Sequence, residues 1–114
     1  MRNFIRVMKA LSDPNRVLIL KLLEQRVLCV CELRELLGLA QPTVSRHLKV
    51  LEEARLIDFS RDGLWVNYRL AGKSDNPCAA AMLDHLKQWL DDDPRVAGTV
   101  EQVPFVNREN ICNR

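Results

Sequence analysis

The 114-residue sequence lacks the features that mark several large classes of protein. Only five prolines and four glycines are present and 47% of the residues are hydrophobic, which favours a folded domain over a disordered chain. No apolar run approaches the roughly 20 residues that cross a bilayer, and the nearest candidate, Leu18 to Leu23, is interrupted by Lys21. The N-terminus has no signal-peptide core. We therefore expect one domain-sized cytoplasmic chain with no membrane partner.

Motifs of enzyme chemistry are also missing. The sequence has no nucleophile–base motif and no phosphate-binding loop, and its one acid cluster is Asp91, Asp92 and Asp93. These aspartates precede Pro94 and indicate the end of a helix, with a weak surface cation site as the alternative. We expect a protein that is not an enzyme and needs no organic cofactor.

The net charge of +2 is too small to identify a partner, but its distribution is uneven. Residues 1–70 contain 12 basic and 8 acidic side chains, whereas residues 71–114 contain 5 and 7. A nucleic-acid contact or an ordinary solvated surface would both account for the basic first part.

Helical periodicity predicts five helices, which cover residues 3–11, 14–24, 31–37, 42–54 and 77–90. Asp62 and Gly63 form a strong turn pair and predict a hairpin of strands 56–60 and 64–70. Periodicity is lost after Arg95. The sequence therefore predicts a first unit of residues 1–92 and an irregular tail of residues 93–114 that carries Cys112.

Two short helices separated by Gly38 and followed by a hairpin predict a winged helix-turn-helix, mainly α with a small β-hairpin. In the second of these helices Val44, Leu48 and Leu51 share the core face, so Arg46 and Lys49 face outward.

Candidate DNA contacts are the polar and basic side chains of this helix and of the hairpin, because these residue types bind base edges and phosphates. They are Gln41, Thr43, Ser45, Arg46, Lys49, Arg61 and Arg69. His47 is placed nearer the core boundary, and Trp65 is expected to pack between hairpin and body. A solvated basic face is the alternative, and salt-dependent duplex binding distinguishes the two.

Four segments resemble one known family. They are Ala10 to Arg16, Leu28 to Leu33, Gln41 to Leu51 and Leu64 to Leu70. Over about residues 4 to 90 the chain resembles the ArsR/SmtB family of metal- and metalloid-sensing repressors. The resemblance implies a homodimer formed by the first and last helices, which binds double-stranded operator DNA until an inducer binds.

The sequence departs from the family pattern at several positions. Arg34 stands where many arsenic-sensing relatives have a third cysteine, Ala40 where the reader helix usually has a capping serine, and Arg55 where a glycine is usual. Asp84 and His85 are adjacent, so they point about 100° apart on a helix and do not resemble the family's zinc ligands.

Cys29 and Cys31 match the metalloid-binding box of the family. Residues two apart in a helix point about 200° apart, so both sulfurs can reach one ion only if the backbone there is not helical. Thiolates select soft ions, and As(III) and Sb(III) favour a pyramid of three sulfurs. Cys112 is the preferred third ligand and Cys78 the alternative.

We therefore expect a repressor that releases DNA on binding As(III) or Sb(III). A thiol redox-sensing repressor and a Cd, Pb or Zn sensor of the same fold are the alternatives. The remaining alternative is that Cys29 and Cys31 are a coincidental pair of core cysteines with no functional role.

Overall fold

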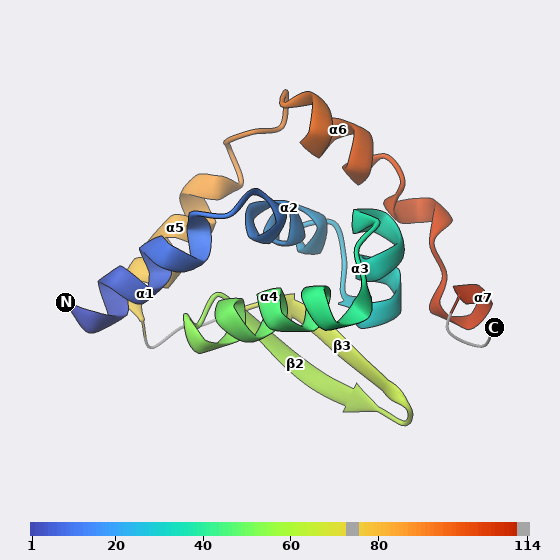
Figure 1. Cartoon of the computed structure of the whole chain (residues 1–114). Coiled ribbons are helices and arrows are strands. Elements are labelled where there is room, and N and C mark those ends of the chain that lie inside the picture. Colours follow the sequence, from blue (N-terminus) through green and yellow to red (C-terminus); the bar gives the residue numbers. More distant parts are fainter. Residues whose placement is uncertain (73–75, 112–114) are drawn as a thin grey trace.

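A computed structural model describes residues 1–72 and 76–111. Its elements, shown in Figure 1, are α1 (Arg2–Leu11), α2 (Pro14–Leu23), β1 (Leu28–Cys29), α3 (Val30–Leu37), α4 (Gln41–Glu53), β2 (Ile57–Asp62), β3 (Trp65–Leu70), α5 (Pro77–Leu86), α6 (Pro94–Val100), η1 (Val103–Phe105) and α7 (Arg108–Ile111). Within these ranges no helix is both long and apolar enough to span a membrane.

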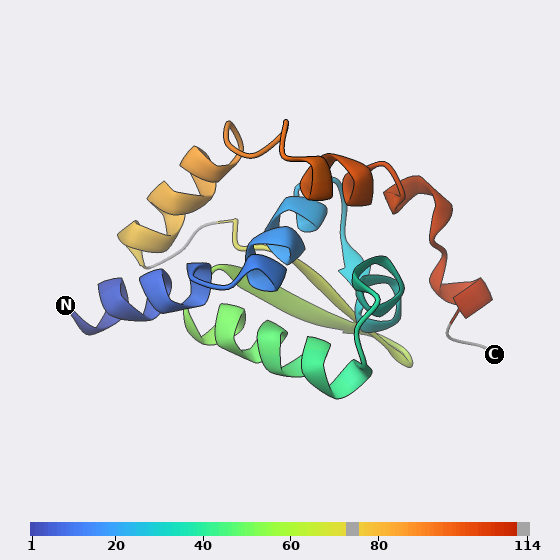
Figure 2. The same cartoon turned by 45° about the horizontal axis from the view of Figure 1, so that its top comes forward.

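Helix α2 occupies the middle of the molecule. Figures 1 and 2 show α1 and α5 together at one end, α3 at the other end, and α4 and the hairpin along one side. Strands β2 and β3 form the predicted hairpin, and β1 pairs with β3 to give an antiparallel sheet of order β1-β3-β2. The predicted winged helix-turn-helix is confirmed, with β1 as a strand that the sequence did not suggest.

The start of α2 shows why the predicted boundaries hold. Asp13 accepts hydrogen bonds from the backbone N–H groups of Asn15 (2.8 Å) and Arg16 (3.2 Å), and Pro14 occupies the first helical position. Burial alone would raise the pKa of Asp13, but these amide bonds outweigh it and lower the pKa. At the end of α3, Gly38 adopts the left-handed conformation (φ 68°) that the predicted stop requires.

The core lies between α2 and the predicted inner face of α4. Val44, Leu48 and Leu51 are at most 1% exposed, as their spacing indicated. Most of α2 is buried, with five apolar side chains in the core: Leu18, Ile19, Leu20, Leu22 and Leu23.

The last third of the chain corrects the sequence analysis. Helix α5 ends at Leu86 instead of Leu90, and the prediction of no regular structure after Arg95 is wrong because α6, η1 and α7 follow. Asp93 begins α6 by accepting from the N–H groups of Arg95 and Val96, so the Asp-Pro pair starts a helix here as it does at α2. These helices are too short for periodicity to reveal them.

A buried lysine connects α2 to the end of α5. The Nζ atom of Lys21 lies 2.9 Å from a carboxylate oxygen of Glu24, 2.9 Å from one of Asp91 and 2.8 Å from the carbonyl oxygen of Leu86. Burial alone would lower the pKa of Lys21, but the two carboxylates outweigh it and raise the pKa above the usual 10.5. Asp91 is thus an ion-pair partner within the protein.

Lys21→Ala should lower the free energy of unfolding by about 2–3 kcal/mol, because it removes a buried cation and leaves its partners without a counterion. The matched control Asp91→Ala removes a carboxylate that is 69% exposed and should cost less than about 1 kcal/mol. Urea unfolding measures both. Since the pKa of Lys21 is raised, the ion pair contributes fully below pH 10.5 and its contribution falls as pH rises further. Equal losses for the two variants would contradict this role.

Candidate nucleic-acid interface and thiol site

The outer face of α4 carries the predicted reader residues. Gln41, Ser45, Arg46 and Lys49 are exposed and Thr43 is half-buried. Helix α4 begins without a side-chain cap at Ala40, as the sequence indicated. The structure therefore places all five side chains on or beside the outward face, and their contact with DNA stays a prediction.

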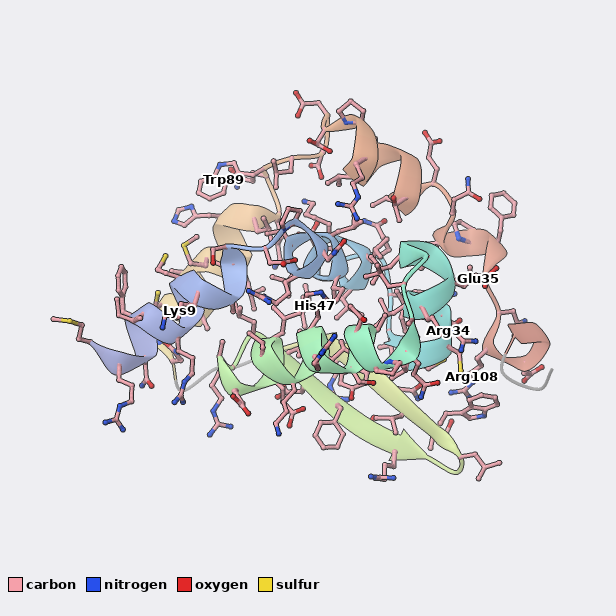
Figure 3. All side chains as sticks on the ribbon, in the orientation of Figure 1. Lys9, Arg34, Glu35, His47, Trp89 and Arg108 are labelled. Atoms are coloured by element: carbon pink, nitrogen blue, oxygen red, sulfur yellow. The ribbon has the colours of Figure 1, made fainter. Side chains whose placement is uncertain are left out.

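His47 is half-buried and faces an arginine that the sequence analysis missed. Arg16 donates from Nε to the carbonyl of Ala10 (2.8 Å) and from Nη2 to that of Lys9 (2.9 Å), and its Nη1 lies 3.4 Å from His47 Nδ1. Arg16 thus satisfies carbonyls at the end of α1 and also contacts α4. Figure 3 shows Lys9 on α1 and His47 on α4, the two helices that Arg16 joins.

The hairpin, called the wing from here on, presents the two predicted arginines. Arg61 and Arg69 are exposed, and Arg69 donates to the hydroxyl of Ser60 (3.3 Å). Gly63 takes the left-handed conformation at the turn (φ 61°), where a side chain would be strained. Trp65 is half-buried, as expected, but the side chain over it is Arg108 of the C-terminal segment, 5.1 Å from the ring centroid.

Cys29 stands at the junction of β1 and α3. Cys29 is 2% exposed, and in the antiparallel sheet it lies opposite Asn67 of the wing strand β3. It is also the N-cap of α3: its side chain accepts from the backbone N–H of Glu32, and its own N–H donates to Glu32 Oε1 (3.0 Å). Cys31 lies inside the first turn of α3. The backbone therefore leaves the helix between the two cysteines, which is the condition that their spacing required.

The thiols differ in environment. Burial raises the pKa of the Cys29 thiol, the Glu32 carboxylate adds to the rise, and amide bonds from Glu32 and Cys31 only partly offset it. Cys29 and Cys78 are free thiols, whereas Cys31 is disulfide-bonded. A thiol that must ionise to bind an ion is thus held in its neutral form at neutral pH.

The described residues do not assemble a complete metal site. Among residues 1–72 and 76–111 no group of three or more His, Cys, Asp or Glu side chains is placed to hold an ion. Cys78 lies in the first turn of α5, which is at the opposite end of the molecule from α3 in Figures 1 and 2. Cys112 lies outside the described residues. On α5, His85 stacks on Trp89 with ring centroids 5.3 Å apart, and Asp84 is paired with Lys87.

The fold and the exposed basic helix define a winged-helix regulator of transcription. The sequence profile of the bacterial regulatory proteins of the arsR family matches residues 13–58. The chain is 34% identical to the arsenical resistance operon repressor of Escherichia coli K12, with 96% of this chain and 95% of that protein covered. The protein belongs to the ArsR family.

Other similar proteins agree with this assignment. The arsenic resistance transcriptional regulator ArsR1 of Pseudomonas putida is 38% identical over 76% of this chain and 71% of its own length. The structure of HlyU from Vibrio cholerae N16961 matches with a TM-score of 0.64 and 28% identity, over 76% of this chain and 90% of that chain. The arsR-family profile and both of these sequence relatives describe regulators or repressors, so the protein is a transcriptional regulator and not an enzyme.

The environment of Cys29 predicts slow alkylation. In the reduced native protein at pH 7.5, iodoacetamide should modify Cys29 at least about tenfold more slowly than in the urea-unfolded chain, because the thiol is buried and its pKa is raised. The rate should rise when the pH exceeds the usual thiol value of 9.0. Mass-spectrometric mapping measures this, with the half-buried Cys78 as the internal reference. Equal native and unfolded rates at Cys29 would show that the site is open.

Proposed function

We propose that this protein is a cytoplasmic homodimeric repressor that binds operator DNA through α4 and the wing. Binding of As(III) or Sb(III) by Cys29, Cys31 and Cys112 then releases the DNA. The observation that carries the proposal is the position of Cys29, which caps the helix preceding α4 and pairs with a strand of the wing.

The DNA-binding half rests on α4 and the wing. Arg46 and Lys49 are exposed on the outer face of α4, close to three smaller polar side chains that hydrogen-bond to base edges: Gln41, Thr43 and Ser45. Arg61 and Arg69 of the wing suit the neighbouring phosphates. The proposal of a homodimer is supported by α1 and α5, which pack together and leave two apolar side chains of α1 partly exposed, Phe4 at 51% and Ile5 at 42%.

Arg46→Ala and Lys49→Ala should each weaken operator binding by about tenfold without changing the unfolding curve. For each lost phosphate contact, the slope of log K against log salt should decrease by about 0.9. Fluorescence anisotropy with a labelled operator duplex measures both quantities. Arg95→Ala is the charge-matched control, since α6 lies across the molecule from α4 in Figure 1. Wild-type affinity in both reader variants would remove α4 as the DNA contact.

The inducer half rests on sulfur chemistry at the α3 cap. Trivalent arsenic and antimony bind soft thiolates. Each As–S bond that forms replaces one As–OH bond of arsenous acid, and the departing hydroxide combines with the thiol proton to form water. Cys29 supplies one sulfur from outside the helix and Cys31 a second from its first turn. Helix α7 ends one residue before Cys112 in the sequence and packs beside α3, which supports Cys112 as the third ligand.

Ligation and DNA binding compete through the Cys29 sulfur. That sulfur accepts a hydrogen bond from the backbone N–H of Glu32 when it caps α3. Turning the sulfur toward an ion breaks this hydrogen bond and removes the cap. Helix α3 packs on α4, and the residue that pairs with Cys29 lies on wing strand β3. A change at this one residue therefore reaches both elements proposed to touch DNA.

Cys29→Ser should leave operator affinity within about twofold and abolish release by As(III), because a serine oxygen still caps α3 but does not replace the soft sulfur ligand. The measurement is anaerobic titration of the reduced protein with As(III), Sb(III), Cd(II) and Zn(II), counting free thiols lost per ion. Wild type should lose three thiols per As(III), and Cys112→Ser should lose two. Cys78→Ser is the matched control and should keep three. A Cys29→Ser variant that still responds would refute the site.

A thiol redox switch is the second candidate function. The observation that favours it is that Cys31 is disulfide-bonded. The same titration separates the two functions. Absence of tight binding to all four ions, together with DNA release on oxidation that thioredoxin reverses, would favour the redox switch over the metalloid sensor.

A further inference from the structure

The wing is held by a residue far away in the sequence. Arg108, at the start of α7, donates from Nη1 to Asn67 Oδ1 (3.0 Å) and from Nη2 to Asp62 Oδ2 (3.0 Å). Its guanidinium carbon lies 5.1 Å from the centroid of the Trp65 ring. Asp62 ends β2 and pairs with Trp65 at the start of β3, so the Arg108 side chain contacts both strands of the wing. Figure 3 shows Arg108 reaching from the C-terminal segment toward the wing.

A second arginine ties the same segment to the α3 cap. Arg26 Nη2 donates to the carbonyl oxygens of Val106 (2.9 Å) and Val103 (3.3 Å), and to Glu32 Oε2 (3.1 Å). The other carboxylate oxygen of Glu32 accepts the N–H of Cys29 (3.0 Å). Val103 is also part of the hydrophobic core. The chain between Val103 and Arg108 is thus bonded to the thiol-bearing cap at one end and to the wing at the other.

We infer that residues 103–108 form a strap through which the α3 cap, made by Cys29 and Glu32, controls the wing. Arg108 is the residue of the strap that positions the wing. The inference rests on the proposed function, in which the wing contacts DNA and Cys29 binds the inducer. Ligation that moves Cys29 disturbs the Cys29–Glu32 hydrogen bond. Glu32 shares Arg26 with the strap carbonyls, so the disturbance passes to the strap and then through Arg108 to the wing.

Arg108 acts on the wing in two ways. Its planar guanidinium meets an amide oxygen, a carboxylate and an aromatic face, and a lysine ammonium cannot match these three partners together. It also neutralises Asp62, whose side chain is 66% exposed and which follows Arg61 at the end of β2. Without Arg108, the wing would be less fixed and would present an uncompensated negative charge near the phosphates.

The test uses the full chain with Trp89→Phe, so that Trp65 is the only tryptophan. Arg108→Ala and Arg108→Lys are compared with Arg95→Ala, which removes an arginine of the C-terminal segment whose side chain donates to Asn15 and not to the wing. Three quantities are measured: Trp65 emission and anisotropy in the free protein, operator affinity, and the ratio of operator affinities without and with As(III).

With Arg108→Ala we expect a red shift and lower anisotropy of Trp65, operator affinity reduced about fivefold, and an As(III) effect on DNA affinity reduced at least about fivefold. As(III) stoichiometry should be unchanged. Arg108→Lys should restore part of the affinity, through its charge, but little of the Trp65 signal or of the As(III) effect. Arg95→Ala should behave as the parent in all three measurements.

Two outcomes would overturn the strap. One is an unchanged Trp65 signal in Arg108→Ala and Arg108→Lys. The other is a changed Trp65 signal with parental operator affinity and a parental As(III) effect, which would make Arg108 merely structural. The Trp65 measurement needs neither DNA nor inducer, and failure of the proposed function would instead appear as no operator binding or no As(III) effect in the parent protein.

Discussion

The reciprocal cap between Cys29 and Glu32 is the interaction on which the rest of the site depends. A helix start leaves amide groups without partners, and here two reciprocal hydrogen bonds between one cysteine and one buried glutamate satisfy the N–H groups of Glu32 and Cys29. The cap determines where β1 ends and α3 begins. It therefore sets the direction in which α3 leaves the sheet, and with it the position of the helix-turn-helix relative to the wing.

The remainder of the fold holds that junction from both sides. Helix α2 fills the centre, and its buried Lys21 binds the end of α5 and Asp91, so the segment leading to α6 is anchored by charge as well as by apolar contact. Val96 and Val103 then join the core, which brings the C-terminal segment beside α3. Arg26 and Arg108 make the final connections to Glu32 and to the wing. The C-terminal segment, far from Cys29 in the sequence, thereby becomes part of the environment of the α3 cap.

Sequence reasoning succeeded where one local rule was sufficient. The Asp13-Pro14 start, the Gly38 stop, the inward face of Val44, Leu48 and Leu51, and the Asp62-Gly63 turn all follow from local propensity and period. It failed where structure depends on distant contacts. Strand β1 has two residues and exists only because β3 lies beside it. The three aspartates before Pro94 predict a helix end, yet Asp93-Pro94 begins α6 in the same way as Asp13-Pro14 begins α2. Arg16, Arg26 and Arg108 could not be assigned, since each acts through a carbonyl, carboxylate or ring brought close only by the fold.

The choice of cysteine at the α3 cap has a physical consequence for regulation. Sulfur is a weaker hydrogen-bond acceptor than the oxygen of Ser, Thr or Asp, which are the side chains that helix N-termini prefer. A cap made by sulfur is correspondingly easier to withdraw, and burial and the raised pKa of Cys29 keep the thiol neutral. Stability at this turn comes instead from Glu32, whose second oxygen is held by Arg26. In the proposed mechanism a soft ion withdraws the sulfur cap first, and movement of Cys29 then disturbs its hydrogen bond to Glu32 and, through Arg26, residues 103–108. Under the proposed function, ligand binding would alter α3 and the wing without unfolding the core to which both are attached.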